Sequence, residues 1–181
     1  MPDFKKLILR KFNDIAGSRY EEIIKAYREF LLTEEEMEIP VISSVLLVVD
    51  RFSEEPPEEI YDVLTSYPGA FIKVIYLIDG RLCALIQETL GEEAAKKFRI
   101  NEKSMGEEFI RDISGRLSQL GVNFSSEILF EDKASFVEDA MEDYDLLVIS
   151  KHFGSEGLKT YNITPLAFRI VQRIEKPVIL Y

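Results

Sequence analysis

The stretch that decides the fold is DLLVISKHFGSEGLKTYNITPLAFRI, residues 145–170, in which an apolar run, a glycine-containing loop and a helical pattern follow one another. The run over residues 146–150 is short, apolar and bounded by polar residues, which is typical of a buried strand. Thr164 followed by Pro165 indicates the N-cap and first turn of a helix over 165–174. Because a helix N-terminus beside glycine backbone presents free amides, the loop predicts an anion-binding site.

Working outward, four more strands and further helices are expected. The apolar runs VISSVLLVVD, AFIKVIYLID, NFSSEILFED and VILY occupy residues 41–50, 70–79, 123–132 and 178–181. The periodicity predicts helices over 53–64, 80–90, 105–120 and 135–144, and residues 91–104 are ambiguous. Buried strands that alternate with helices indicate an α/β domain with a five-stranded, parallel, doubly wound sheet.

Ligands of doubly wound sheets bind beyond the carboxyl ends of the strands, at the point where the strand order reverses. Polar residues at the predicted strand ends are therefore the first candidates for a site. They are Asp50, Asp79, Glu131 and Asp132, together with the loop after Ser150. Glu131 and Asp132 are adjacent in an extended chain, so their side chains diverge and do not form a catalytic pair.

The first forty residues follow a helical period instead. Apolar positions over 3–32 recur at helical spacing, the pattern breaks at Ala16-Gly17, and Ser18 with Glu21 forms a capping box. We predict a helical hairpin and a linker over 1–40, followed by the α/β domain over 41–181. Each predicted helix has one apolar stripe, which needs cover from the other helix, the main domain or another subunit.

Composition narrows the function classes. The net charge of −11 disfavours nucleic acid and anionic membranes as partners, because the field of the protein repels phosphate. Cys83 is the only cysteine, which excludes an internal disulfide and a thiolate metal site and is typical of the reducing cytoplasm. With no run of about 18 apolar residues, we expect a cytoplasmic protein without a transmembrane segment.

Residues 41–181 resemble the universal stress protein family. The resemblance rests on Val49-Asp50 at the end of the first strand, on FEDKASFVEDAMEDYDLLVIS over 130–150, on the histidine in the glycine-containing loop, and on KPVIL over 176–180. It implies the Rossmann-like fold of the adenine nucleotide alpha-hydrolases, a homodimer and, in ATP-binding members, an adenine nucleotide with Mg²⁺ on its phosphates. An apolar final strand at a sheet edge favours the same dimer, and the N-terminal hairpin could extend its interface.

The ATP-binding motif of that family is degenerate in this chain. The motif is Gly, two residues, Gly, nine residues, Gly and then Ser or Thr. Ser150 stands at the first glycine, Gly154 matches the second after a one-residue insertion, and Thr164 and Pro165 stand at the final pair. Because Pro165 has no amide to donate and a hydrogen bond to an anion contributes ~1.5–3 kcal/mol, binding is expected to weaken roughly ten- to a hundredfold.

The resemblance implies a nucleotide-binding set with Asp50 and Val74 near the adenine and the loop residues near the phosphates. The set is Asp50, Val74, Ser150, His152, Gly154, Gly157, Thr164 and Pro165. Simpler interpretations stay open for its members. Asp50 could cap the turn that follows it, His152 could be an incidental loop residue, and both glycines could serve only the turn.

Two hypotheses about function follow. In the first, the chain is a stress-response regulatory module that binds an adenine nucleotide. In the second, it is a homodimeric interaction protein that has lost the ATP site and acts through an unknown protein partner. We predict no catalytic residue and no metal site, because the chain has no Walker lysine loop, no G-x-S-x-G elbow, no G-x-G-x-x-G and no metal-ligand spacing.

Overall fold

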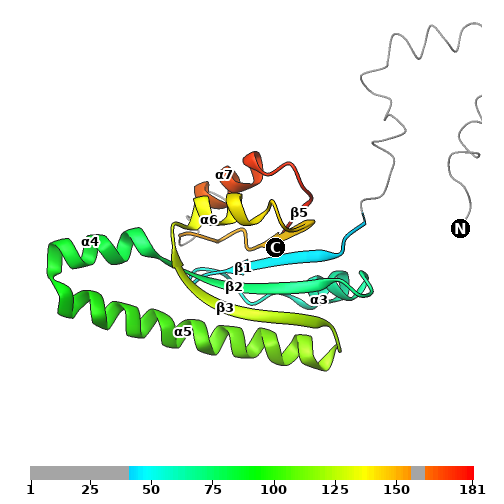
Figure 1. Ribbon diagram of the computed structural model, residues 1–181, viewed down its shortest axis with the longest axis horizontal. Coiled ribbons are helices and arrows are strands. Elements are labelled where there is room, and N and C mark those ends of the chain that lie inside the picture. Colours follow the sequence, from blue (N-terminus) through cyan, green and yellow to red (C-terminus); the bar gives the residue numbers. More distant parts are fainter. Residues whose placement is uncertain (1–40, 156–161) are drawn as a thin grey trace, which may run out of the picture. The chain divides into compact units, whose positions relative to one another are not determined.

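A computed structural model describes residues 41–155 and 162–181. Five parallel strands form one sheet in the order β3-β2-β1-β4-β5 (Figure 1). The strands are β1 (Ser44–Val49), β2 (Phe71–Asp79), β3 (Asn123–Glu131), β4 (Leu146–Ile149) and β5 (Val178–Leu180). The predicted five-stranded doubly wound α/β fold is confirmed, and the expected hairpin over 3–32 lies outside the described residues.

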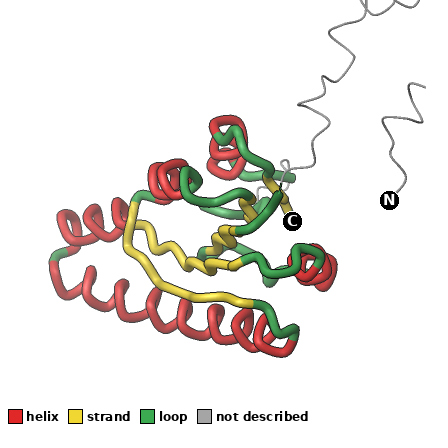
Figure 2. The backbone as a smooth tube through the Cα atoms, turned by 45° about the vertical axis from the view of Figure 1, so that its right-hand side comes forward, coloured by secondary structure: helices red, strands yellow, loops and turns green. Residues whose placement is uncertain are grey.

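Helices cover both faces of the sheet. They are α3 (Glu58–Thr65), α4 (Gly80–Leu90), α5 (Glu92–Gln119), α6 (Lys133–Ala140) and α7 (Pro165–Arg173). The tube in Figure 2 shows α5 on one side of the sheet and α6 and α7 on the other. Helix α4 runs beside the first half of α5, and this helical pair extends past the carboxyl ends of the strands (Figure 1).

The helix boundaries differ from the predicted ones for local reasons. Helix α3 begins at Glu58 rather than residue 53, because Pro57 is its extended N-cap, with ψ 165°. Helix α6 begins at Lys133 rather than residue 135, because the Asp132 side chain accepts a hydrogen bond from the Ser135 amide and caps the helix. The ambiguous residues 91–104 are helical and belong to α5 after Gly91.

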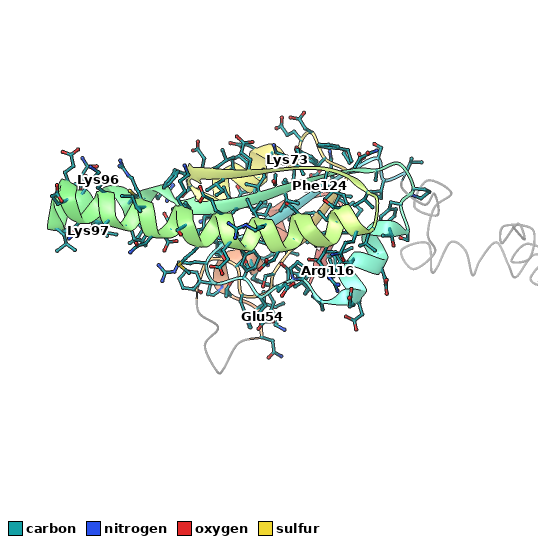
Figure 3. The ribbon with its side chains drawn as sticks, turned by 90° about the horizontal axis from the view of Figure 1, so that it is seen from below. Glu54, Lys73, Lys96, Lys97, Arg116 and Phe124 are labelled. Carbon is teal, nitrogen blue, oxygen red and sulfur yellow. The ribbon has the colours of Figure 1, made fainter. Side chains whose placement is uncertain are left out.

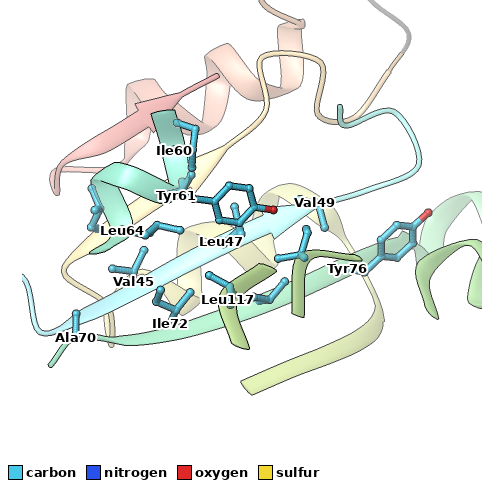
Figure 4. Packing of buried hydrophobic residues seen from close by; sticks show 14 of the residues in the cluster. Val45, Leu47, Val49, Ile60, Tyr61, Leu64, Ala70, Ile72, Tyr76 and Leu117 are labelled. Carbon is cyan, nitrogen blue, oxygen red and sulfur yellow. The ribbon is translucent and has the colours of Figure 1, made fainter. Parts of the chain in front are cut away.

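The central strand β1 supplies both halves of the core. Its side chains alternate between the faces: Val45, Leu47 and Val49 point toward α3 and α5, and Leu46 and Val48 toward α6 and α7. All five are fully buried. Figure 4 shows the first of these clusters.

On the α5 side, the Tyr76 ring lies directly on the helix backbone. The Tyr76 ring occupies the space next to Gly106, where a Cβ atom would come within 2.7 Å of Tyr76 Cδ1. Glycine is therefore required at this turn of α5 by close packing rather than by backbone torsion.

Strand order reverses at β1, which is the position at which ligand crevices form in doubly wound sheets. The chain moves outward from β1 to β2 and β3, and then returns to place β4 on the other side of β1. Val48 pairs with Ile149, so Asp50 and Ser150 follow neighbouring strand ends. At the opposite end of the same two strands, Asp145 Oδ2 accepts hydrogen bonds from the amides and hydroxyls of Ser43 and Ser44. Over residues 41–155 and 162–181, no helix is long and apolar enough to cross a membrane.

Candidate functional site

Asp50 lies at this reversal of strand order, directly after β1, and it is fully buried. Its Oδ1 accepts hydrogen bonds from the Phe52 amide at 3.1 Å, the Ser53 amide at 3.0 Å and the Ser53 hydroxyl at 2.8 Å. Its Oδ2 accepts from Lys133 Nζ at 2.6 Å and from the Gly154 amide at 2.7 Å. Asp50 thus caps the turn that follows β1 and also joins this turn to the loop after β4.

Lys133 is a member of the site that sequence reasoning missed. Its side chain is 5% exposed and forms an ion pair with Asp50. Its ammonium also lies 5.4 Å from the ring centroid of Phe52 and 5.5 Å from that of Phe153. Two aromatic faces and a carboxylate therefore stabilise a cation that has almost no water around it.

The loop after β4 is held by its own hydrogen bonds. The Ser150 hydroxyl accepts from the His152 amide at 3.1 Å, and Ser150 is fully buried. The Thr164 hydroxyl donates to the Phe153 carbonyl at 2.5 Å and accepts from the Ala167 amide at 3.2 Å, which makes Thr164 the expected N-cap of α7. Both polar side chains of the degenerate motif are thus engaged within the protein.

Gly154 joins this loop to Asp50 through a conformation that other residues rarely adopt. Its φ is +94°, and a Cβ at this position would collide with the Leu166 side chain. A side chain would therefore be disfavoured both by the torsion and by the packing. The Gly154 amide consequently points at an anionic oxygen, as a phosphate-binding amide does.

The other predicted members lie further from this centre. His152 Nδ1 is 3.0 Å from Glu54 Oε1, at the surface of the crevice. Pro165 is exposed at the first position of α7. Val74 is fully buried in the middle of β2 on the face covered by α3 and α5, so the structure does not bring it to the loop. Gly157 lies outside the described residues.

The remaining strand-end acids serve local structure. Asp79 caps α4 by accepting from the Leu82 amide at 3.0 Å. Asp132 caps α6, and its hydrogen bond from the Ser135 amide lowers the pKa of its carboxyl. Among residues 41–155 and 162–181, no group of three or more histidine, cysteine or acidic residues could hold a metal ion.

The residue after Asp50 contacts α5. Arg51 pairs with the buried carboxylate of Glu102 at 2.7 Å. Burial raises the pKa of Tyr76, and the charges of Glu102 and Asp50 raise it further. Burial also raises the pKa of Tyr181, whose hydroxyl donates to the backbone carbonyl of Glu54 at 3.4 Å.

In chemical terms, the site is an anion-binding site that holds the protein's own anion. An ammonium and a backbone amide converge on one carboxylate oxygen at the reversal of strand order. The structure brings Asp50, Ser150, Gly154 and Thr164 of the predicted nucleotide-binding set together and adds Lys133.

Known proteins share this fold. No protein-family model and no curated protein sequence matches the chain. The hypothetical protein MJ0577, whose biochemical function was assigned from its structure, aligns with a TM-score of 0.61 at 16% identity over 78% of this chain and 96% of that protein.

Two universal stress proteins align less closely. For the protein UspA from Lactobacillus plantarum the TM-score is 0.51, at 14% identity over 78% of this chain and 99% of the other. For a universal stress protein family member from Burkholderia pseudomallei the TM-score is 0.50, at 18% identity over 80% of this chain and 98% of the other. The domain over 41–181 therefore has the universal stress protein fold, and the resemblance predicted from the sequence is confirmed at that level.

Proposed function

We propose that the chain is a non-catalytic cytoplasmic regulatory module of the universal stress protein type, and that an adenine nucleotide with Mg²⁺ binds in the crevice at the ends of β1 and β4. One observation carries the proposal: Lys133 Nζ and the Gly154 amide both contact Asp50 Oδ2, at 2.6 Å and 2.7 Å. A phosphate oxygen accepts hydrogen bonds from the same pair of donors.

Nucleotide binding then requires an exchange of anions. A phosphate oxygen takes the contacts of Lys133 and Gly154, while Asp50 stays anchored to Ser53 through Oδ1. Mg²⁺ offsets the repulsion between the phosphates and the released carboxylate oxygen, because carboxylate and phosphate oxygens are its preferred ligands. Pro165 contributes no amide, so we expect affinity about ten- to a hundredfold below that of a site with this donor.

A second candidate function is favoured by the closure of the same site. Asp50 and Ser150 are fully buried, Thr164 is 2% exposed, and the side chains of all three are hydrogen-bonded within the protein. In this alternative the Asp50–Lys133 pair replaces a ligand permanently, and the chain is a homodimeric interaction protein that acts through its surfaces.

Nucleotide titration separates the two candidates. Freshly purified protein is denatured and its supernatant chromatographed for adenine nucleotides, and the native protein is then titrated calorimetrically with ATP and Mg²⁺. The first candidate predicts saturable binding that chelation of Mg²⁺ weakens. Absence of both bound nucleotide and heat of binding at millimolar ATP, with the protein folded, would support the second.

Variants assign any binding to the crevice. Lys133→Met removes the ammonium and should weaken ATP binding at least about tenfold, because a charge-assisted hydrogen bond is lost. Lys97→Met makes the same substitution on the exposed side of α5 and should leave the affinity unchanged. Equal affinities for the two variants would place the nucleotide elsewhere on the chain.

Dimerisation belongs to both candidates. Strand β5 ends the sheet order beside β4, with its three residues half-buried, and such an edge offers backbone groups to a symmetry mate. We expect light scattering to give twice the mass of the 20.9 kDa chain. If the hairpin over 1–40 extends the interface, its removal will lower the dimer affinity; an unchanged affinity would contradict that role.

A further inference from the structure

A cavity lies near the carboxyl ends of β2 and β3, where these strands meet α4 and α5. It has a volume of about 470 Å³ and is lined by Gly80, Cys83, Arg99 and Phe130. These residues come from the start of α4, from α5 and from the last part of β3. The volume is within the range of about 300–1,000 Å³ that is usual for small-molecule sites.

Arg99 brings a weakly compensated positive charge to this cavity. Its Nε donates to Cys83 Sγ at 2.8 Å and its Nη2 to Gln87 Oε1 at 3.3 Å. Neither acceptor carries a carboxylate charge, and a thiol is a weak acceptor. Within residues 41–155 and 162–181, Arg99 forms no ion pair, so N–H donors of the guanidinium are available to an anionic ligand.

The helix around Arg99 carries two further positive charges. Lys96 and Lys103 are three residues before and four residues after Arg99, which places the three cations on one side of α5. Lys96 lies at the end of α5 that extends past the sheet (Figure 3). Lys103 is 3.8 Å from the exposed carboxylate of Glu107, a separation at which a surface ion pair is weak.

The two acidic residues that follow Phe130 have other surroundings. The Glu131 backbone adjoins Gly80, but Glu131 and Asp132 line a different cavity beside α6. Asp132 is also paired with Arg81 at 2.7 Å. Among the described residues that line the cavity, Arg99 is the one that carries a charge.

Phe130 supplies the apolar part of the cavity. Its side chain is 40% exposed, although it lies at the end of a strand beside the core. An aromatic ring next to a guanidinium matches a ligand that has both a flat apolar body and a negative group. We propose that the Cys83–Arg99–Phe130 cavity binds a small aromatic carboxylate, independently of the nucleotide crevice.

Calorimetric titration with 1-naphthoate tests this proposal, with neutral 1-naphthalenemethanol as the matched control ligand. Saturable 1-naphthoate binding is expected, and the alcohol should bind at least about tenfold more weakly because it loses the charge-assisted hydrogen bond.

Two variants on α5 make the test specific. Arg99→Met removes the charge and should weaken 1-naphthoate binding at least about tenfold. Arg111→Met is the same substitution at an exposed position of the same helix and should change nothing. Absence of saturable binding at millimolar 1-naphthoate, or equal affinities of the two variants, would each overturn the proposal.

Discussion

Lys133→Met is expected to destabilise the protein strongly. Removing one partner of a buried ion pair costs about 3–5 kcal/mol, because the other charge stays buried and unpaired. Here Asp50 keeps hydrogen bonds from the Phe52 and Ser53 amides, the Ser53 hydroxyl and the Gly154 amide. We therefore expect a loss of about 3 kcal/mol, at the lower end of that range. Methionine retains the apolar stem of the lysine, so the loss reports the charge rather than a cavity.

Urea unfolding of the full chain, followed by circular dichroism, measures this loss. Asp50→Asn should also cost about 3 kcal/mol, because it leaves the Lys133 ammonium buried without its counterion. The double variant should cost about 4 kcal/mol rather than the sum of about 6, a coupling near 2 kcal/mol. A Lys133→Met protein within about 1 kcal/mol of the wild type, or strictly additive costs, would refute the assignment of a buried ion pair. Lys97→Met should change stability by less than about 0.5 kcal/mol.

Two further predictions concern the framework around the site. Gly106→Ala should lower the free energy of unfolding by about 1–3 kcal/mol, because the new methyl group meets the Tyr76 ring. Gly115→Ala on the same helix meets no atom within 4 Å and should raise the free energy of unfolding by up to ~1 kcal/mol. Equal effects of the two variants in urea unfolding would contradict the packing argument. Hydrogen bonds led by those from Ser43 lower the pKa of Asp145 to about 2, so its contribution to stability is complete above its ordinary pKa of 3.8 and is lost as the pH falls toward 2. Asp145→Asn should make the free energy of unfolding less dependent on pH in that window. Parallel acid-unfolding curves for the variant and the wild type would show that the hydrogen bonds from Ser43 and Ser44 to Asp145 are unimportant.

The strands could be predicted from the sequence because their chemistry is local. Val45 to Val49 are consecutive apolar residues, and burial on both faces of a parallel sheet requires such a run. The first half of α5 was ambiguous for the opposite reason. It extends past the sheet, so few of its residues are buried and the apolar period is weak there.

The site was predictable in part. The loop from Ser150 to Thr164 has a strand before it and an N-cap after it, and these signals are visible in the sequence. Lys133 is 83 positions away from Asp50. Only the crossover from β3 through α6 brings the two side chains together, and no local pattern encodes that approach. Lys133 directly follows the run predicted as a strand over 123–132, and this position was the one signal that could have suggested it.

The central place of β1 affects how the chain folds during synthesis. Strands β2 and β3 and their helices can join β1 early, but the other edge of β1 pairs with β4, about 100 residues later, as in the pair Leu46 and Leu147. At about 5–20 residues per second, that edge stays open for roughly 5–20 s on the ribosome. During this interval an apolar strand has unpaired backbone groups, which is the form that chaperones bind and that aggregates recruit. The strand order that joins Asp50 to the loop after β4 thus leaves one edge of the central strand without its partner for much of the synthesis.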